Sequence, residues 1–379
     1  MLAWAGDSPV AAQAGGVVAG DTGWAWAFLA CAAAAAVAYG IGLAALRRGS
    51  PLRGPVVAVA LAIQLVPLGA PLLLSTDAWT YWAYARIAAV HGGDPYTDAP
   101  QDYPEDPAFP WVGADWRDSG SVYGPAFTLA SEATAPLESE DASAWAFKGA
   151  AAAALVVCVL LAAARGPFAA AFVGWNPVLA LHFDGGGHND AWMAALVLAA
   201  ITLAASSRRQ LAGAAWALAV LVKWVPLIFL PLRALEARST GRRLAHVGFA
   251  LAVVAVLGVA TLQFGLSWLD AFGPLAGNAG GGTGYALPSR LEDVGLPRWL
   301  AVGLFGAAFV VAYVWLLREA WHGRARLGLA AGFALLATPY LAPWYLVWAV
   351  PLAAVEEDRA ARLLALVLTA YLLPQTIPV

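Results

Sequence analysis

The chain has 379 residues, of which 61% are hydrophobic and only 12% are charged, and its formal net charge is -3. Ordinary soluble domains have about 25% charged residues, so this composition excludes a soluble fold and predicts a polytopic membrane protein in contact with membrane lipids. The small negative net charge provides no basic surface for a nucleic-acid partner. We therefore expect residues 1–379 to form a single, all-α membrane domain.

Apolar stretches long enough to cross about 30 Å of hydrocarbon predict seven full spans. These spans are 24–46, 55–75, 144–164, 167–183, 191–207, 244–264 and 299–317. A shorter apolar stretch follows at 363–379. The regions 211–235 and 327–355 have prolines near their midpoints, so each is predicted to form two short helices joined as a hairpin. The total is about twelve transmembrane or re-entrant helices.

The positions of the basic residues predict the orientation of these helices. When the spans alternate in direction, most of the 21 Lys and Arg residues fall on one side of the membrane. The positive-inside rule makes that side cytoplasmic. The other side carries the longest extramembrane segment, residues 76–143. We therefore expect a multi-pass protein of the plasma membrane, with residues 76–143 as an extracytoplasmic loop.

The extracytoplasmic loop begins with Thr76 and Asp77, followed by an aromatic segment up to residue 90. This segment predicts a juxtamembrane helix that lies in the membrane interface. A carboxylate at the membrane edge suits a general base, which makes Asp77 a candidate catalytic residue. Thr and Asp are also favoured at helix N-caps, so a purely structural role for this pair stays open.

A second polar cluster, Asp184 to Asp190, lies between two predicted spans. Ionisable residues at such a depth usually serve a function. Backbone N–H groups at the start of the second of these helices attract anions, which makes His188 and Asn189 candidates for binding a phosphate. The alternative is that Asn189 or Asp190 only caps this helix.

Two lysines lie in apolar surroundings. Lys223 precedes Trp224-Val225-Pro226 at the tip of the first predicted hairpin, where an isolated ammonium would be costly without an anionic partner. A phosphate would supply that partner, and snorkelling of the side chain toward the interface is the alternative. Lys148 allows the same two interpretations, with snorkelling preferred.

Two other segments have mainly structural interpretations. Trp175-Asn176-Pro177 predicts a kink in its span, with Asn176 bonded to the backbone groups that the kink frees. The glycine-rich run from Gly277 to Gly284 follows no strand and lacks a Walker lysine. It therefore predicts a mobile loop rather than a nucleotide-binding site.

In their order along the chain, these pieces resemble the polyprenol-phosphate-mannose-dependent mannosyltransferases of the glycosyltransferase C superfamily, especially the actinobacterial α-1,6-mannosyltransferases that extend lipomannan. The matching pieces are Ser75-Thr76-Asp77, Gly93-Asp94-Pro95-Tyr96, Tyr123-Gly124-Pro125, Trp175-Asn176-Pro177, Gly187-His188-Asn189-Asp190, Lys223 with Pro226, and Pro343-Trp344-Tyr345. The resemblance implies a helical membrane module of the glycosyltransferase C type, with a substrate cavity beneath its outer loops. It also implies that Asp77 is the catalytic base. The chain is shorter than expected for the lipomannan enzymes, which leaves the acceptor open.

The resemblance further implies inverting transfer of mannose from a polyprenyl-phosphate-mannose donor to a glycolipid or glycan acceptor, forming an α-mannosidic bond on the extracytoplasmic face. We expect Asp77 to accept the proton of the acceptor hydroxyl. Lys223, His188 and Asn189 are expected to bind the donor phosphate. Asp190 or Asp184 is expected to orient His188 or hold sugar hydroxyls. The expected contacts to sugar or acceptor are Asp184, Asp190, Tyr81, Tyr123, Tyr340, Trp344 and Tyr345.

Three alternatives remain at this point. Asp77, Asp184 and Asp190 could jointly hold Mg²⁺ or Mn²⁺, but a phosphate neutralised by Lys and His needs no metal, so we expect no cofactor. A secondary transporter would share the broken helices and buried charges, yet no inverted repeat is evident and the polar groups cluster on the outer side. Within the enzyme class, another lipid-linked sugar such as glucose or arabinofuranose is the main competitor.

Overall fold

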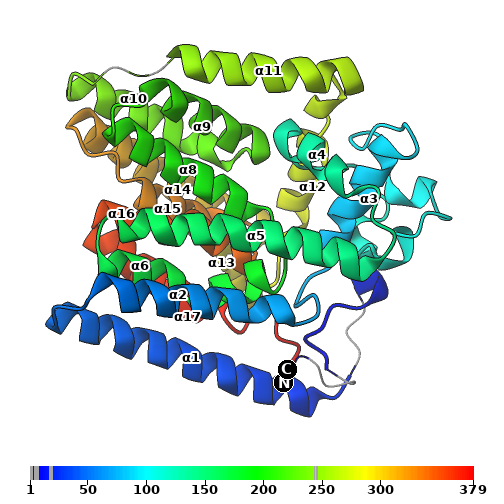
Figure 1. Cartoon of the computed structure of the whole chain (residues 1–379), viewed down its shortest axis with the longest axis horizontal. Helices are drawn as coiled ribbons and strands as arrows, with labels where there is room; N and C mark the ends of the chain where they lie inside the picture. The colour runs from blue at the N-terminus through cyan, green and yellow to red at the C-terminus, as the bar shows by residue number, and fades with distance from the viewer. Residues whose placement is uncertain (1–2, 4–7, 17–19, 243, 245) are drawn as a thin grey trace.

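The computed structural model describes residues 3, 8–16, 20–242, 244 and 246–379 (Figure 1). These residues form helices, and apart from an isolated antiparallel bridge between Ala11 and Leu73 they contain no β-structure. The prediction of an all-α fold is therefore confirmed.

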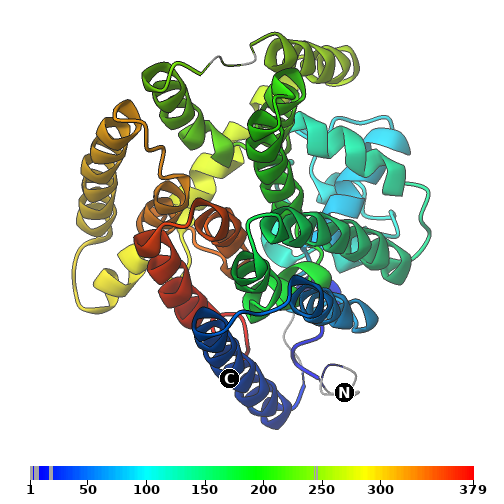
Figure 2. The same ribbon diagram turned by 60° about the vertical axis from the view of Figure 1, so that its left-hand side comes forward.

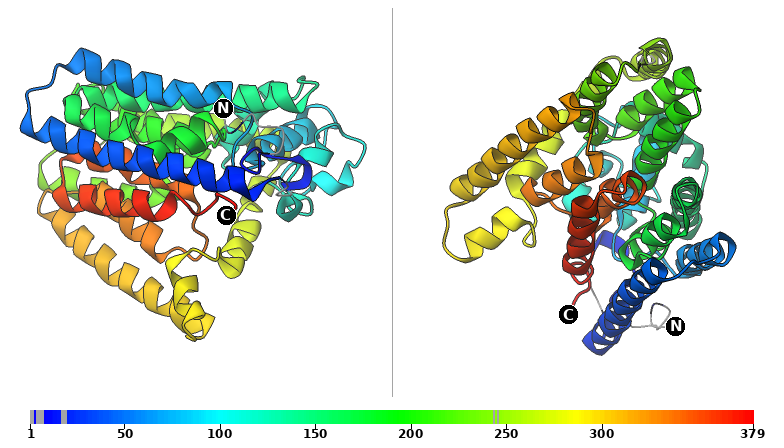
Figure 3. Two further views of the ribbon diagram at one scale, coloured as in Figure 1. Left: turned by 90° about the horizontal axis from the view of Figure 1, so that it is seen from below. Right: turned by 90° about the vertical axis from the view of Figure 1, so that its left-hand side faces the viewer.

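Most helices lie alongside one another and run back and forth along one axis (Figures 1 and 3). They are α1 (Thr22–Arg48), α2 (Arg53–Leu65), α5 (Glu140–Ala163), α6 (Pro167–Gly174), α8 (Asp190–Ala205), α9 (Arg209–Val222), α10 (Phe229–Ser239), α11 (His246–Phe264), α14 (Arg298–Trp321), α15 (Leu327–Ala337), α16 (Val350–Glu356) and α17 (Arg359–Leu372). Helices α5, α8, α9 and α11 pack successively against one another, and α10 and α15 both pack against α14 (Figure 2). Every predicted span contains a helix, and both predicted hairpins are broken near their prolines.

Four of the described helices, α1, α5, α11 and α14, are long and apolar enough to cross a membrane by themselves. Shorter apolar helical segments are Arg53–Gly69, Asp190–Ala205, Arg209–Val222 and Leu327–Ala337. Large side chains such as Leu251, Leu262 and Val311 are exposed on α11 and α14, which fits a hydrocarbon environment. These observations support a membrane protein, and the total of about twelve passes stays a prediction.

The two ends of the helix bundle differ in chemistry. The loops from α1 to α2, α5 to α6, α8 to α9, α14 to α15 and α16 to α17 lie together at the left in Figure 1. These loops and the adjoining helix ends carry arginines, among them Arg47, Arg165, Arg208, Arg324 and Arg359. The segment 76–143 lies at the opposite end. This separation supports the predicted alternation of the spans.

Helix α3 (Asp77–Ala89) opens the segment 76–143, which also contains α4 (Pro125–Ser131). The predicted placement of this first helix in the membrane interface is wrong, because α3 is buried on nearly every face. Arg86 on α3 has its Nε atom 2.9 Å from both carboxylate oxygens of Asp106, and its Nη1 atom donates to the carbonyl oxygen of Ala135. The rest of the loop thus supplies the polar partners that allow α3 to be buried in protein.

A break in the chain after α6 brings the second polar cluster into place. Asn176 lies between α6 and the short helix α7 (Pro177–Leu179), where its Oδ1 atom accepts hydrogen bonds from the backbone N–H groups of Val178 and Leu179. Its Nδ2 atom donates to Thr369 Oγ1 on α17 at 2.9 Å. The predicted kink, with Asn176 bonded to freed backbone, is therefore confirmed. A π-helical turn, Ala180–Asp184, then leads into the glycines before α8.

Helices α12 (Phe272–Gly281) and α13 (Leu287–Asp293) connect α11 to α14. The mobile loop predicted for Gly277 to Gly284 is wrong over its first part, which is helical up to Gly281. Gly282 has a φ of +68°, a left-handed conformation that commonly ends helices at glycine. Arg298 Nη2 also donates to the carbonyl oxygen of Gly280 at 2.5 Å. These contacts give the glycine-rich segment a defined helical end.

Candidate active site

Asp77 is the first residue of α3, and its side chain turns toward the second polar cluster. Thr76 occupies the N-cap position without a side-chain capping bond, so capping does not explain this pair. The Oδ2 atom of Asp77 lies 3.1 Å from His188 Nδ1 and accepts a hydrogen bond from the Tyr81 hydroxyl at 3.3 Å. The carboxylate, which is 13% exposed, is therefore held by two partners and still reaches the surface.

Opposing effects set the pKa of the Asp77 carboxyl. Burial raises this pKa, but the hydrogen bond to His188 and the charges of His188 and Lys223 oppose burial and hold the pKa below its ordinary value. The carboxyl group is therefore ionised at neutral pH. An ionised carboxylate beside a pocket can accept a proton from a bound hydroxyl group.

His188 is fully buried, and its ring stacks on Trp344 with a centroid separation of 3.8 Å and an interplanar angle of 12°. We expected Asp184 or Asp190 to orient this histidine. That expectation is wrong, because the carboxylate beside His188 Nδ1 is that of Asp77. Within the described residues, the Nε2 atom of His188 has no hydrogen-bond partner.

Asp190 is committed to two other partners. Its Oδ2 atom lies 2.7 Å from Lys223 Nζ, and its Oδ1 atom accepts a hydrogen bond from Trp348 Nε1 at 2.6 Å. The side chain of Asp190 is completely buried. The alternative that Asn189 or Asp190 only caps α8 does not hold. Asn189 occupies the N-cap position but makes no side-chain capping bond, and Asp190 bonds to Lys223 and Trp348.

Lys223 lies at the break after α9, in extended backbone conformation. Its ammonium group is 4.9 Å from the ring centre of Tyr345 and 5.9 Å from that of Tyr123. The anionic partner that we expected a phosphate to supply is present in the protein as Asp190. Because an aromatic wall and a carboxylate hold the ammonium group, Lys223 does not snorkel away from the protein.

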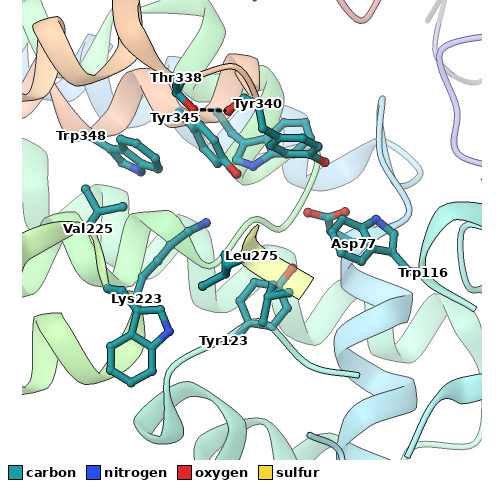
Figure 4. A pocket seen from close by; sticks show the side chains of 13 residues that line it. Asp77, Trp116, Tyr123, Lys223, Val225, Leu275, Thr338, Tyr340, Tyr345 and Trp348 are labelled. Atoms are coloured by element: carbon teal, nitrogen blue, oxygen red, sulfur yellow. Dashed lines mark hydrogen bonds between the residues drawn. The ribbon is translucent and has the colours of Figure 1, made fainter. Parts of the chain in front are cut away.

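A pocket joins Asp77 to Lys223 (Figure 4). It encloses about 820 Å³ of space between the atoms, part of it open to solvent. Its lining residues are Asp77, Trp116, Val122, Tyr123, Lys223, Trp224, Val225, Leu275, Thr338, Tyr340, Trp344, Tyr345 and Trp348. Aromatic rings with a few convergent polar groups are typical of binding sites for small ligands.

The predicted site residues divide into two groups. Those that line the pocket are Asp77, Lys223, Tyr123, Tyr340, Trp344 and Tyr345. Those that lie outside its lining are His188, Asn189, Asp190, Tyr81 and Asp184. Of the residues outside the lining, His188 and Asp190 form hydrogen bonds to the lining residues Asp77 and Lys223. Asn189 has a buried side-chain amide with no partner among the described residues.

Tyr81 and Asp184 do not have the positions that we expected for sugar contacts. Tyr81 is buried behind Asp77, with its ring packed edge-on against Tyr123 at a centroid distance of 4.9 Å. Asp184 is completely buried, and neither of its carboxylate oxygens has a hydrogen-bond partner in the described part of the chain. Both residues are therefore separated from the pocket surface by other side chains.

Lys148 does not snorkel, and the preference for that interpretation is wrong. The lysine is buried near the start of α5, and its ammonium group donates to the carbonyl oxygens of Leu68, Ala70 and Pro71. These oxygens belong to the irregular segment that follows α2, so the lysine satisfies backbone groups that no helix uses. Lys148 is thus a structural partner of the chain leading to Asp77.

The metal site considered for Asp77, Asp184 and Asp190 is not formed. Across the ranges that the structure describes, no group of three or more His, Cys, Asp or Glu side chains could hold a metal ion. Asp77 faces His188, Asp190 faces Lys223, and Asp184 lies apart from the pocket.

Several residues that line the pocket were not predicted from the sequence. Trp348 continues the aromatic run of Trp344 and Tyr345, so this run was an available signal. Trp116 and Leu275 come from segments without any distinguishing pattern, and only the folded chain brings them to the pocket. The lining residues come from two parts of the chain, one between Asp77 and Val225 and the other between Leu275 and Trp348, so neither part forms the pocket alone.

Two family models match the chain, and each of the two matched regions contributes residues to the pocket lining. Residues 4–239 match the model described as alpha-(1->6)-mannopyranosyltransferase, N-terminal domain. The chain belongs to this alpha-(1->6)-mannopyranosyltransferase family. Residues 274–378 match a second model, described as the MptB C-terminal domain. Membership of the family confirms the resemblance that the sequence motifs indicated.

A curated protein of Mycolicibacterium smegmatis, named probable alpha-(1->6)-mannopyranosyltransferase, is similar to the chain. The two are 28% identical over 370 residues, covering 78% of this chain and 64% of the relative. The chain therefore spans less than two thirds of the length of that relative. No solved structure matches the chain.

Proposed function

We propose that this protein transfers mannose from a polyprenyl-phosphate-mannose donor to a glycolipid or glycan acceptor and forms an α-(1→6) bond with inversion at the anomeric carbon. The observation that carries the proposal is one aromatic pocket with an ionised carboxylate, Asp77, and an ammonium group, Lys223, in a chain of this family. The site is proposed to face the extracytoplasmic side of the plasma membrane. The arginines at the opposite end of the helix bundle from residues 76–143 support this orientation, which suits a lipid-linked donor rather than a cytosolic nucleotide sugar.

In the proposed step, the acceptor hydroxyl oxygen attacks the anomeric carbon of the donor mannose. The bond between that carbon and the phosphate oxygen breaks, and its electron pair leaves with the polyprenyl phosphate. The hydroxyl proton goes to Asp77, whose lowered pKa keeps it ready as the ionised form. General-base assistance of this kind contributes about 10² to 10⁴ in rate.

The leaving phosphate is bound at the Lys223 end of the pocket. One N–H of the ammonium group is used by Asp190, and an ammonium has three N–H donors, so two are free for phosphate oxygens. Asp190 fixes the position of this charge, and the stacked rings of Tyr345 and Trp348 limit its movement. Asn189, which was also expected at the phosphate, does not line the pocket, so the phosphate contact is assigned to Lys223 alone.

The pocket walls suit the two other parts of the donor. Tyr340 and Tyr345 line the pocket that joins Asp77 to Lys223 (Figure 4), and Trp344 also belongs to its lining. These rings suit the mannose ring, which must lie between the base and the phosphate. Trp224, Val225 and Leu275 provide an apolar surface near Lys223, which suits the first isoprenoid units. His188, which we first expected at the phosphate, is assigned to holding Asp77.

Family membership favours mannose over glucose or arabinofuranose as the transferred sugar. It also favours an enzyme over a secondary transporter, which was the competing class. A transporter would lose uptake when Asp77 is replaced, whereas the proposed enzyme loses product in washed membranes without any gradient.

The test uses purified protein in lipid with radiolabelled polyprenyl-phosphate-mannose and a membrane glycolipid extract, with and without EDTA. Asp77→Asn keeps the size of the side chain but cannot accept the proton, so transfer is expected to fall by about 10² to 10⁴. Asp293→Asn is the matched control, because Asp293 is exposed on α13. Transfer by wild type and control in EDTA supports the metal-free proposal. An intact donor in every tube, or full activity of Asp77→Asn, overturns it.

A further inference from the structure

The order of groups in an inverting transfer fixes where the acceptor must lie. The attacking oxygen and the leaving phosphate stand on opposite faces of the anomeric carbon, and the base lies on the side of the attacking oxygen. Asp77 and Lys223 lie at opposite ends of the pocket, with Leu275 and Tyr340 between them (Figure 4). The acceptor is therefore expected at the Asp77 end.

Trp116 lies at that end of the pocket, beside Asp77 in Figure 4. It closes the short 3-10 turn Ala114–Trp116, which follows Gly113. A Cβ atom on Gly113 would lie 2.6 Å from Thr76 Oγ1 and 3.6 Å from Trp116 Cδ1. The turn that carries Trp116 thus packs directly against the residue that precedes the proposed base, and glycine makes this close approach sterically accessible.

The loop around Trp116 is fixed in place by Arg117. The Nε atom of Arg117 donates to the carbonyl oxygen of Val112 at 3.2 Å, and its Nη2 atom donates to that of Pro110 at 3.2 Å. Its guanidinium carbon lies 5.0 Å from the ring centre of Phe109. Trp116 is therefore presented by a braced loop, which lowers the entropic cost of binding a ligand there.

The ring of Trp116 differs from the other pocket tryptophans in having no aromatic partner. Trp344 stacks on His188, Trp348 stacks on Tyr345 at a centroid distance of 4.2 Å, and Trp224 packs against Phe272 at 4.8 Å. Trp116 is half-buried against the hydrophobic core and lines the pocket, and among the described residues it has no aromatic partner and no side-chain hydrogen bond. Its ring face and its N–H group are thus available to a ligand.

We infer that Trp116 is the platform on which the acceptor sugar ring stacks, with the ring presenting its hydroxyl group to Asp77. This inference rests on the proposed function. The apolar C–H face of a pyranose suits an aromatic ring, and the indole N–H can donate to a sugar hydroxyl. The α-(1→6) linkage in the family description calls for an acceptor sugar with a free 6-hydroxyl group, and a terminal mannosyl unit is the one that we propose.

The experiment compares wild type, Trp116→Ala and Trp116→Phe in lipid, with α-(1→6)-mannobiose as the acceptor probe. Trp116→Ala is expected to raise the KM for mannobiose by about tenfold and to change the KM for the lipid-linked donor by less than about twofold, because stacking serves only the acceptor. Trp116→Phe keeps a ring and is expected to recover most of the loss. Trp26→Ala is the control, since Trp26 is 59% exposed on α1, outside the pocket.

Direct binding of mannobiose, measured by saturation-transfer NMR without donor, separates this inference from the proposed function. If wild type binds mannobiose and Trp116→Ala does not, the acceptor platform stands even when no donor is consumed. If Trp116→Ala binds mannobiose as wild type does, or if the donor KM rises instead, the inference is overturned while the proposed transfer can stand. Should Trp116→Ala fail to fold, Trp116→Leu keeps the apolar volume and carries the same expectations.

Discussion

The Nδ1 atom of His188 lies 3.1 Å from the Oδ2 atom of Asp77, although the two residues are 111 positions apart in the chain. His188 stacks in turn on Trp344, which belongs to the second of the two family-matched regions. Three distant segments therefore position the proposed base. The orientation of the Asp77 carboxylate depends on both regions of the chain, so the pocket and the base are assembled together.

Replacing His188 should shift the pH dependence of transfer. His188→Phe keeps a ring that can stack on Trp344 but removes the hydrogen bond and the charge that lower the pKa of Asp77. Burial, the largest effect, then acts with less opposition and raises this pKa. A base must be ionised to act, so the acidic limb of the kcat/KM profile should move to higher pH.

The measurement is kcat/KM for labelled mannose transfer across the acidic and neutral range. His322→Phe is the matched control, because His322 is exposed at the end of α14. An acidic limb of His188→Phe that superimposes on that of wild type would show that His188 does not set the pKa of Asp77. The unfolding temperature of His188→Phe shows whether the variant is folded, so that a misfolded variant is not mistaken for one with a changed pKa of Asp77.

The ion pair between Lys223 and Asp190 predicts an asymmetric double-mutant cycle. Lys223→Met leaves the fully buried Asp190 carboxylate unpaired, which should lower the free energy of unfolding by about 3 to 5 kcal/mol. Adding Asp190→Asn removes the unpaired charge and should restore most of that stability. It should not restore donor binding, because the ammonium that would meet the phosphate is still absent.

Thermal unfolding in detergent and the KM for the donor are the two measurements for this cycle. The exposed pair of Arg290 and Asp293 is the control, since surface ion pairs contribute little to stability. A double variant that recovers both stability and donor KM would remove Lys223 from phosphate binding. One that recovers neither would show that Asp190 has a role beyond pairing with Lys223.

The sequence was sufficient to locate the helix breaks that create the site. Asn176 before Pro177 predicted a kink with its own hydrogen-bond partners, and these are present. The prolines in 211–235 and 327–355 predicted two broken hairpins, and the breaks bring Lys223 and Trp344 to the pocket. Such features are local, because a missing N–H and a fixed φ act on the nearest turn of the helix.

The pairing of distant polar groups was not predictable in the same way. Which carboxylate faces His188 depends on how α3 meets the start of α8, and no spacing in the sequence encodes that contact. Lys148 has the position of a snorkelling lysine, yet its partners are carbonyl oxygens about 80 residues earlier in the chain. The aromatic face of α3 suggested an interface helix because Asp106, the partner of Arg86, was not recognised.

Replacing Asp184 should leave the proposed transfer nearly intact. Its carboxylate is buried, makes no hydrogen bond among the described residues and does not line the pocket. Asp184→Asn replaces a buried carboxyl group that lacks a hydrogen-bond partner in the described part of the chain, and Lys148 keeps its three carbonyl partners. We expect an unfolding temperature equal to or above that of wild type and a transfer rate within about threefold.

The transfer assay with labelled donor and a melting curve in detergent check this expectation. Asp77→Asn provides the comparison, because it has the same chemical change at the proposed base. A loss of transfer by Asp184→Asn as large as that of Asp77→Asn would return Asp184 to the role of a sugar contact, as the sequence first suggested.

The kink at Asn176 should contribute to stability rather than to catalysis. Asn176→Ala removes the acceptor for the N–H groups of Val178 and Leu179 and the donor to Thr369, all in a buried position. Losing such a cap lowers the free energy of unfolding by about 1 to 3 kcal/mol. Thr369→Val, which removes only the contact with the Asn176 amide and the hydroxyl bond to Ala365, should cost less.

Unfolding midpoints in detergent, together with kcat and KM of the folded fraction, separate stability from catalysis at this kink. We expect both kinetic constants of Asn176→Ala to stay within about threefold of wild type, because none of the three bonded groups lines the pocket. Equal destabilisation by Asn176→Ala and Thr369→Val would mean that the side-chain contact between α17 and the kink, and not the backbone cap, carries the stability. A changed donor KM would show instead that the kink sets the position of the cluster that follows it.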